Sequence, residues 1–206
     1  ATRMVLLARR AFSDWSKSSI GHRAKCLKKF AKLLMANRHR IALAVTRDTG
    51  KALWESEEEA AALISKIGIT LTESVRDVQR SARTMDRGAF CVFRPYGVAT
   101  VLGPFNFPLH LPHGHIVPAL LAGNTVVFKP SDKACRAGVV YAACARAAGF
   151  PAGVLTVVQG PAEVGEVLAG HPDVSMVLFT GSYSVGLRLQ QLEIHQPDKL
   201  LALELG

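Results

Sequence analysis

The sequence contains little cysteine, and its cysteines form no framework. The four, Cys26, Cys91, Cys135 and Cys144, are spread over 206 residues without any C-x-x-C spacing. Disulfide-rich secreted domains and zinc ribbons need cysteines that are denser or more closely spaced. We therefore expect reduced, mostly structural thiols in a cytoplasmic protein.

A membrane-spanning run is also lacking. The longest uncharged stretch, residues 95–128, is interrupted by five prolines and holds three histidines and two asparagines, whereas a spanning helix needs about 20 predominantly apolar residues. No signal or transit segment precedes the first helix, and the missing initiator methionine suggests a trimmed or partial N-terminus. With 49% apolar and 20% charged residues the composition is globular, and we expect no membrane partner.

Acidic residues are scarce in the first fifty positions. Residues 1–50 hold twelve Lys and Arg against Asp14 and Asp48, a net charge of +10, so the remaining 156 residues contribute −1 to the total of +9. Such a basic arm raises nucleic acid, or a scaffold, as a partner. The sequence has no nucleic-acid-binding motif and no aromatic residues interleaved with the basic ones, so we favour a solvated basic face and expect no nucleic-acid partner.

What the sequence does contain is a change of pattern near Gly88. Before it, apolar positions recur at helical spacing over residues 20–45 and 54–78, with Thr49-Gly50 as a stop between them. After it, short β-rich runs alternate with helical segments. We predict strands at residues 98–102, 125–129, 154–159, 174–179 and 200–205, and helices near 111–122, 132–148, 161–170 and from 184. The alternation predicts an α/β fold, a Rossmann-like parallel sheet with helices on both faces, preceded by an N-terminal helical region.

Ligands of open parallel sheets bind where strands end, and four strand ends here carry polar or glycine-rich residues. The first is GPFNFPLH, in which the amide of Asn106 suits a developing oxyanion and equally suits a helix cap. The second is FKPSD, in which Lys129 and Asp132 could bind ribose hydroxyls. Taken alone, that stretch is better explained as a helix start capped by Ser131.

The third strand end is FTGSYSVG, residues 179–186, where Gly181 and Ser182 offer a pyrophosphate site at a helix N-terminus. Its G-x-x-x-x-G spacing is weak by itself, and a plain strand–turn–helix junction is the alternative. The fourth is Glu204, a lone carboxylate in LLALELG. Facing a dry pocket, Glu204 would have a raised pKa and could act as a general base, whereas a structural ion pair is the competing explanation.

Three histidines lie close together at His110, His113 and His115 and invite a metal site. No further Cys, His or carboxylate is positioned to complete a closed coordination shell. We therefore expect no metal, and we place these histidines at a pocket entrance or a helix start.

In this order, the motifs strongly resemble those of the NAD(P)-dependent aldehyde dehydrogenase superfamily. The matching segments are RPYGVATVLGPFNFP, PALLAGNTVVFKPSD, GFPAGVLTVVQG, LFTGSYSVG and LALELG, with FSDWS and DTGKALWE upstream. The resemblance implies that Asn106 holds the oxyanion and that Glu204 activates the hydrolytic water. It also implies that Lys129 and Asp132 bind the adenosine ribose, the acidic residue suggesting NAD over NADP. The pyrophosphate would lie against Gly181, Ser182, Tyr183, Ser184, Val185 and Gly186.

Within the superfamily, the His-Leu-Pro-x-Gly-His segment at residues 110–115 is similar to that of the N-succinylglutamate 5-semialdehyde dehydrogenases of arginine catabolism. The sequence departs from that subfamily at Phe105 and Leu109, where tyrosine and glycine are usual. The implied reaction is thiol attack on the aldehyde, hydride transfer to the nicotinamide and hydrolysis of the thioester. Another aldehyde dehydrogenase subfamily is the alternative.

The resemblance places the nucleophilic cysteine beyond residue 206, so we expect this segment alone to be inactive, and a truncated nucleotide-binding remnant stays an alternative. The resemblance also implies that the chain consists of three parts. Residues 1–73 are the helical part of the NAD-binding domain, residues 74–94 a projecting β segment like the family's oligomerisation strands, and residues 95–206 the truncated Rossmann-like core. We expect a small aldehyde substrate and a homo-oligomer for the full-length protein.

Overall fold

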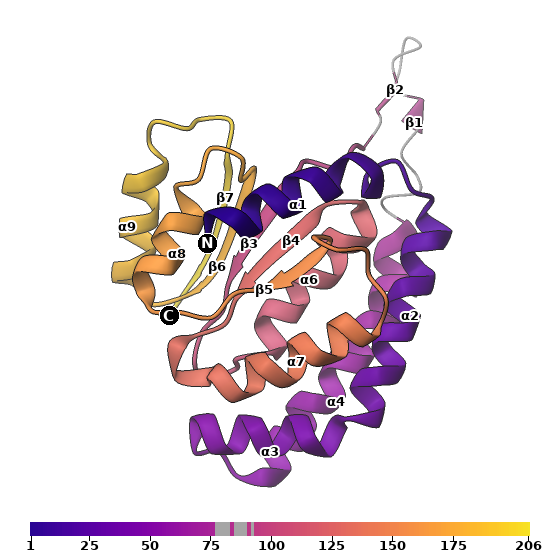
Figure 1. The fold of residues 1–206 in the computed structure, drawn as a ribbon, viewed down its shortest axis with the longest axis vertical. Coiled ribbons are helices and arrows are strands. Elements are labelled where there is room, and N and C mark those ends of the chain that lie inside the picture. The colour runs from indigo at the N-terminus through magenta and orange to yellow at the C-terminus, as the bar shows by residue number, and fades with distance from the viewer. Residues whose placement is uncertain (77–82, 85–89, 92) are drawn as a thin grey trace.

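The centre of the protein is a five-stranded parallel sheet in the order β5-β4-β3-β6-β7 (Figure 1). The computed structural model describes residues 1–76, 83–84, 90–91 and 93–206. The strands are β3 (Val98–Leu102), β4 (Thr125–Lys129), β5 (Leu155–Val157), β6 (Met176–Gly181) and β7 (Leu200–Leu205). All five predicted strands are present and every neighbouring pair is parallel, which confirms the predicted α/β fold.

The order of the strands reverses at β3. From β3 the chain adds β4 and then β5 on one side, and afterwards adds β6 and β7 on the other side. The registers are regular: Leu102 at the end of β3 pairs with Lys129 of β4 and with Phe179 of β6. Such a reversal leaves a crevice at the carboxyl ends of the two central strands, and this crevice is the usual ligand site of open α/β sheets.

The side chains of the central strands alternate between two hydrophobic clusters, one on each face of the sheet. In β3, Val98 and Leu102 join one cluster, while Ala99 and Val101 join the other. All five residues of β3 and all five of β4 are buried. The near-continuous apolar runs VATVL and TVVF follow from this two-sided burial.

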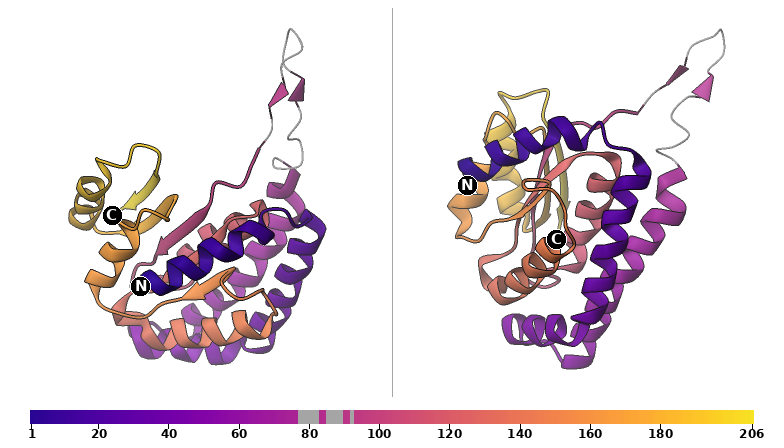
Figure 2. Two further views of the ribbon diagram at one scale, coloured as in Figure 1. Left: turned by 45° about the horizontal axis from the view of Figure 1, so that its top comes forward. Right: turned by 45° about the vertical axis from the view of Figure 1, so that its right-hand side comes forward.

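Helices cover both faces, as Figures 1 and 2 show. One cluster contains side chains of α1 (Thr2–Trp15), α8 (Ala162–Ala169) and α9 (Tyr183–Glu193). The other cluster contains side chains of the remaining long helices, which are α2 (Ile20–Ala36), α3 (Arg38–Thr49), α4 (Leu53–Ile69), α6 (His110–Ala122) and α7 (Cys135–Ala147).

The predicted helix over residues 20–45 is two helices, α2 and α3, which meet at Asn37. Asn37 leaves helical geometry with φ −107° and ψ 11°, and its side-chain nitrogen donates to the carbonyl oxygen of Leu33 at 2.8 Å. Asparagine competes in this way with the backbone bonds of a helix. The predicted stop at Gly50 is confirmed, because this residue ends α3 in the left-handed region with φ 76°.

The predicted helix from Trp54 is α4, which continues through one π-helical turn, η1 (Thr70–Ser74). Within residues 74–94 the structure describes a two-stranded antiparallel ladder of β1 (Arg83–Thr84) and β2 (Phe90–Cys91), separate from the main sheet. Part of this segment lies outside the described residues, namely 77–82, 85–89 and 92. Its role in oligomerisation stays a prediction.

Helix α6 packs behind the sheet, and distant residues bind its last carbonyl groups. The indole Nε1 of Trp15 donates to the carbonyl oxygen of Leu120 at 3.1 Å. The guanidinium Nε of Arg23 donates to that of Leu121 at 2.8 Å. Gly123 then ends the helix with φ 97°. The N-terminal helices thereby satisfy carbonyl groups that helix ends leave without partners.

The basic residues of the first fifty positions are exposed, with the exception of Arg23. This exposure agrees with the expected solvated basic face. Among the described residues, no helix combines the length and the apolar character that crossing a bilayer demands.

Candidate functional site

A cavity of about 760 Å³ opens at the carboxyl edge of the sheet. Its walls come from the ends of β3, β4, β6 and β7 and from α8 and α9, so it lies at the reversal of strand order. Seven of the ten predicted site residues line it: Asn106, Lys129, Asp132, Gly181, Ser182, Val185 and Glu204. Residues up to 98 positions apart in the sequence are thus brought to one place.

Lys129 is the last residue of β4, and its side chain reaches the cavity from a buried position. Its Nζ donates to the carbonyl oxygen of Pro130 at 3.2 Å. Burial lowers the pKa of Lys129, and the nearby charge of Asp132 opposes this shift. The ammonium group therefore carries unused donors at the edge of the cavity, beside an exposed carboxylate.

The predicted cap at Ser131 is confirmed. Its Oγ accepts from the backbone nitrogen of Lys133 at 3.2 Å and begins the 3₁₀ turn η3 (Asp132–Ala134), after which α7 starts at Cys135. Asp132 stands in the first turn and also lines the cavity. The FKPSD segment can therefore cap the start of a helix through Ser131 and also present Asp132 to the cavity.

The loop after β6 ends at the N-terminus of α9. Ser182 is the N-cap residue, and its side chain makes no capping hydrogen bond. Its Oγ lies 3.3 Å from the Oγ of Ser184 instead. Ser182 and Val185 line the cavity, so the positive end of the α9 dipole opens on it, in an arrangement that favours an anion.

Three residues of the predicted loop lie outside the lining of the cavity: Tyr183, Ser184 and Gly186. Gly186 is buried, and a Cβ atom there would come within 2.6 Å of the side chain of Leu205. Its missing side chain thus allows α9 to approach β7 closely. Close packing of α9 on β7 therefore explains the glycine at position 186. Gly181 and Ser182, in contrast, line the cavity.

Asn106 lies exposed in the loop between β3 and α6. Its Oδ1 accepts from the backbone nitrogen of Phe107 at 3.0 Å, which leaves the side-chain NH₂ group to donate. The alternative of a cap for the next helix is wrong, because α6 begins at His110 with Leu109 as its N-cap and without a side-chain cap bond.

Glu204 lies near the end of β7, the edge strand, and its Oε2 accepts from Thr180 Oγ1 at 3.2 Å. Among the described residues the side chain is exposed at the cavity, and its role as a general base stays a prediction. The competing ion pair is not among the ion pairs found between those residues. Instead, the charge of Glu204 acts on His115: burial lowers the pKa of His115, and the carboxylate opposes this shift.

The three histidines lie in the first two turns of α6, which begins at His110, so the expected helix start is confirmed. His113 among them is a core residue rather than one at a pocket entrance. It is fully buried, its Nε2 donates to the carbonyl oxygen of Leu63 at 2.9 Å, and its Nδ1 accepts from the hydroxyl of Tyr141 at 2.7 Å. Burial lowers its pKa to about 3. Across the described ranges, no group of three or more His, Cys, Asp or Glu residues could hold a metal ion.

Residues 1–206 match the model of a sequence family that is described as "Aldehyde dehydrogenase family". The chain belongs to this family. The N-succinylglutamate 5-semialdehyde dehydrogenase of Chromohalobacter salexigens is 47% identical over 203 residues, which are 98% of this chain and 42% of the relative. The enzyme of that name from Klebsiella pneumoniae is 45% identical over 203 residues, 98% of this chain and 41% of the relative. The chain thus spans about two fifths of the length of these relatives.

Solved structures agree with this membership. An NAD-dependent aldehyde dehydrogenase from Sinorhizobium meliloti superposes with a TM-score of 0.91 at 30% identity, over 98% of this chain and 41% of that one. A betaine aldehyde dehydrogenase variant from Staphylococcus aureus, solved in complex with NAD+, superposes with a TM-score of 0.89 at 29% identity. That match covers 100% of this chain and 43% of the other.

No cysteine of the described part of this aldehyde dehydrogenase chain lines the cavity. Cys26 and Cys144 are buried in the helical core, and burial raises the pKa of both thiols. Cys135 is exposed and lines a separate cavity between α3 and α7. A thiol nucleophile for this site is therefore not among these three residues.

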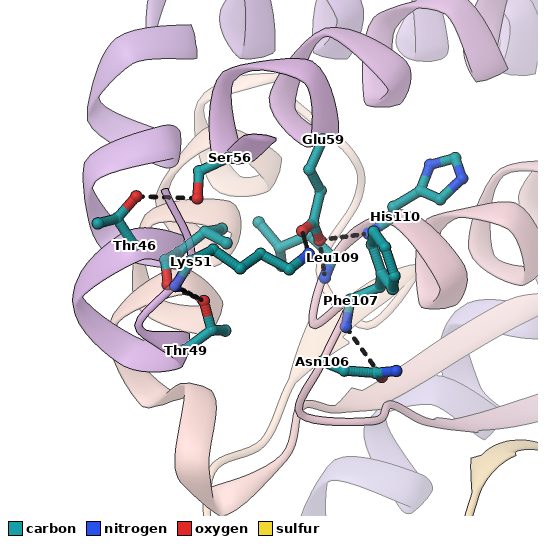
Figure 3. Close-up of polar contacts among 10 residues, drawn as sticks. Thr46, Thr49, Lys51, Ser56, Glu59, Asn106, Phe107, Leu109 and His110 are labelled. Atoms are coloured by element: carbon teal, nitrogen blue, oxygen red, sulfur yellow. Dashed lines mark hydrogen bonds and ion pairs between the residues drawn. The ribbon is translucent and has the colours of Figure 1, made fainter. Parts of the chain in front are cut away.

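One ion pair beside the site, between Lys51 and the buried Glu59, could not be recognised from the sequence (Figure 3). The four glutamates near the start of α4 suggest only acidic residues suited to the helix dipole. The structure separates them, because Glu59 is buried and Glu58 is exposed. A helical wheel centred on Ala60 and Leu63 would have placed Glu59 toward the core, but it could not have named its partners.

Proposed function

We propose that the protein containing this chain oxidises an aldehyde to a carboxylate with NAD, and that its substrate is N-succinylglutamate 5-semialdehyde. The chain would supply the part that binds the cofactor. The observation that carries the proposal is the gathering of the predicted site residues around one cavity at the reversal of strand order. The names of the relatives support the choice of substrate.

The residues around the cavity fit a dinucleotide. Its volume of about 760 Å³ lies within the usual range for small-molecule sites, about 300–1,000 Å³. The uncapped N-terminus of α9 at Gly181 and Ser182 would bind the pyrophosphate. Lys129 would donate to a ribose hydroxyl, and the carboxylate of Asp132 would accept from one. When bound, NAD supplies the acceptor for a hydride from the substrate.

The two proposed catalytic groups lie on the same cavity. The free NH₂ of Asn106 would donate to the oxygen that gains negative charge when a thiol adds to the aldehyde. Glu204 would take a proton from the water that hydrolyses the resulting thioester, and Thr180 would orient its carboxylate. We place the thiol in a part of the polypeptide other than the described residues.

We also propose that the protein works as a homo-oligomer in the cytoplasm, with the segment around β1 and β2 at a subunit contact. Two short antiparallel strands apart from the main sheet support this assignment. Three described cysteines that form no disulfide are consistent with a reducing compartment. Analytical ultracentrifugation of the full gene product tests the assembly; a monomer would overturn it.

The decisive experiment measures NADH formation by the full gene product with N-succinylglutamate 5-semialdehyde, and uses betaine aldehyde and glutamate 5-semialdehyde as controls. Isothermal titration with NAD runs alongside it. We expect tight NAD binding and the largest kcat/KM for the succinylated substrate. Binding without turnover would indicate a nucleotide-binding remnant, preference for a control aldehyde would indicate another subfamily, and the absence of NAD binding would overturn the proposal.

The assignment of Asp132 predicts a change of cofactor preference. Asp132→Asn removes the negative charge that would repel the 2′-phosphate of NADP, so the ratio of kcat/KM for NAD over NADP is expected to fall by about tenfold, as for one lost charge interaction. Asp198→Asn, an exposed residue outside the lining of the cavity, is the matched control. An unchanged ratio for Asp132→Asn would place the ribose elsewhere.

A further inference from the structure

Glu59 of α4 has a fully buried side chain, yet three hydrogen-bond donors meet its carboxylate. Its Oε1 accepts from the backbone nitrogens of Leu109 and His110, both at 3.1 Å. Its Oε2 accepts from Lys51 Nζ at 3.0 Å. Figure 3 shows the carboxylate between the lysine and these two amides. An unpaired carboxylate would be costly to bury, and these three bonds offset that cost.

The two amides belong to the start of α6, which has neither a side-chain cap of its own nor an acidic residue in its first turn. Glu59 therefore caps this helix from fifty positions away in the sequence. A negative charge is favourable there because it meets the positive end of the helix dipole. The contact fixes where the loop after β3 ends and where α6 begins.

Lys51 holds the same loop at a second point. Its Nζ lies 3.5 Å from the centroid of the Phe107 ring, in a cation–π contact. The backbone nitrogen of Phe107 in turn binds Oδ1 of Asn106. The ion pair thus contacts residues 107, 109 and 110, which follow Asn106 closely in the loop. Asn106 itself lines the cavity. Neither Lys51 nor Glu59 lines that cavity.

We propose that Glu59, paired with Lys51, is a positioning residue that holds the Asn106 amide in place for the oxyanion. The inference rests on the proposed role of Asn106. It assigns to α4 a function in the reaction, although no residue of α4 lines the cavity. Oxyanion donors are effective because they are fixed in advance, and this buried network fixes the loop that carries one.

The test compares Glu59→Gln with Glu58→Gln in the full gene product, because Glu58 is the exposed neighbour on the same helix. Glutamine keeps an acceptor for the amides but turns its NH₂ toward Lys51 or loses that contact. We expect kcat to fall by about tenfold to a hundredfold for Glu59→Gln, as for a slight misplacement, with NAD affinity unchanged. Hydrogen exchange at the amides of Leu109 and His110 should quicken. Glu58→Gln should leave both unchanged.

A double-mutant cycle with Asn106→Ala separates positioning from a general structural effect. If Glu59 acts through Asn106, Glu59→Gln lowers kcat little further in the Asn106→Ala background. Equal losses in both backgrounds, or unchanged exchange at Leu109 and His110 in Glu59→Gln, overturn the positioning role. An unchanged kcat for Asn106→Ala alone overturns the proposed function at this residue instead.

If Glu59→Gln does not fold, Phe107→Leu provides the same test without disturbing the buried charge, because it removes only the ring beneath Lys51. A smaller fall in kcat is expected, together with faster exchange at the backbone amide of residue 107. Wild-type kcat with wild-type exchange in Phe107→Leu would contradict the positioning role of the pair.

Discussion

The loop after β3 and the last residues of strand β7 carry the two proposed catalytic groups, Asn106 and Glu204, and the chain holds them very differently. β3 is the central strand and is buried throughout, and the loop after it is bound by Glu59 and Lys51. β7 is an edge strand whose residues are exposed or half-buried, and Glu204 receives one described hydrogen bond, from Thr180. The loop that carries Asn106 is bound at Phe107, Leu109 and His110, whereas among the described residues Glu204 is bound through Thr180 of β6 alone.

This difference suits the two proposed tasks. A donor to an oxyanion must be in place before the charge develops, since reorganisation during the reaction would cost rate. A general base that works on water needs contact with solvent and tolerates some movement. In the proposed mechanism, the more rigid half of the cavity would carry the electrostatic task, and the more open half would carry the proton transfer.

The largest effect should come from the core beneath the β3 side. Phe128 of β4 is fully buried and packs edge-on against Tyr141. Phe128→Ala should lower the free energy of unfolding by about 3–5 kcal/mol. Leu200→Ala in β7, where the side chain is 43% exposed, should cost less than about 1 kcal/mol. Urea unfolding of both variants checks the contrast, and similar losses would abolish it.

An intermediate effect should appear on acidification, through His113 of α6. In the unfolded chain its pKa is about 6.5, whereas in the folded protein burial lowers it to about 3. The unfolded state therefore binds the proton first, so stability is fully present above about pH 6.5 and falls by about 1.4 kcal/mol for each pH unit below it. Urea unfolding between pH 7 and 5 measures this.

The matched variant is His113→Gln, which removes the titrating ring. It should be less stable at pH 7, because the bonds to Tyr141 and Leu63 change, but its stability should depend less steeply on pH. Parallel pH profiles for the two proteins would mean that His113 does not account for the acid sensitivity.

The smallest effect on stability should come from the β7 side. Glu204→Gln keeps the shape of an exposed side chain and an acceptor for Thr180, so the free energy of unfolding should change by less than about 0.5 kcal/mol. In the full gene product the same variant should abolish most hydrolysis of the acyl intermediate while NAD still binds. A large loss of stability would show that Glu204 is a structural residue instead.

The strands around the site could be predicted from the sequence because each strand has a one-dimensional signature, whereas their order in the sheet comes from the structure. β7 begins and ends where LLALEL does, and β3 where VATVL does. The break at Asn37 was missed, because apolar spacing persists across it and only the asparagine marks it. The predicted helix at 132–148 begins as a 3₁₀ turn before α7, a distinction too fine for periodicity.

The lining of the cavity could be predicted for residues at or just after a strand end, such as Asn106, Lys129 and Gly181; their roles stay predictions. The prediction was less complete where a contact joins distant segments. Glu59 and Leu109 are fifty positions apart, and no local sequence pattern near either residue indicates their contact. Local sequence also does not show that β7 lies at the edge of the described sheet with the side chain of Glu204 exposed.

Helix α6 draws its terminal partners from the N-terminal helices at both ends: Glu59 at its start, and Trp15 and Arg23 at its finish. This arrangement bears on how the molecule can be dissected. An excised segment of residues 95–206 would contain every described strand of the main sheet, yet its central helix would lose the groups that bind both of its ends. A minimal unit cut from this protein to test the proposed nucleotide binding must therefore keep residues 1–73.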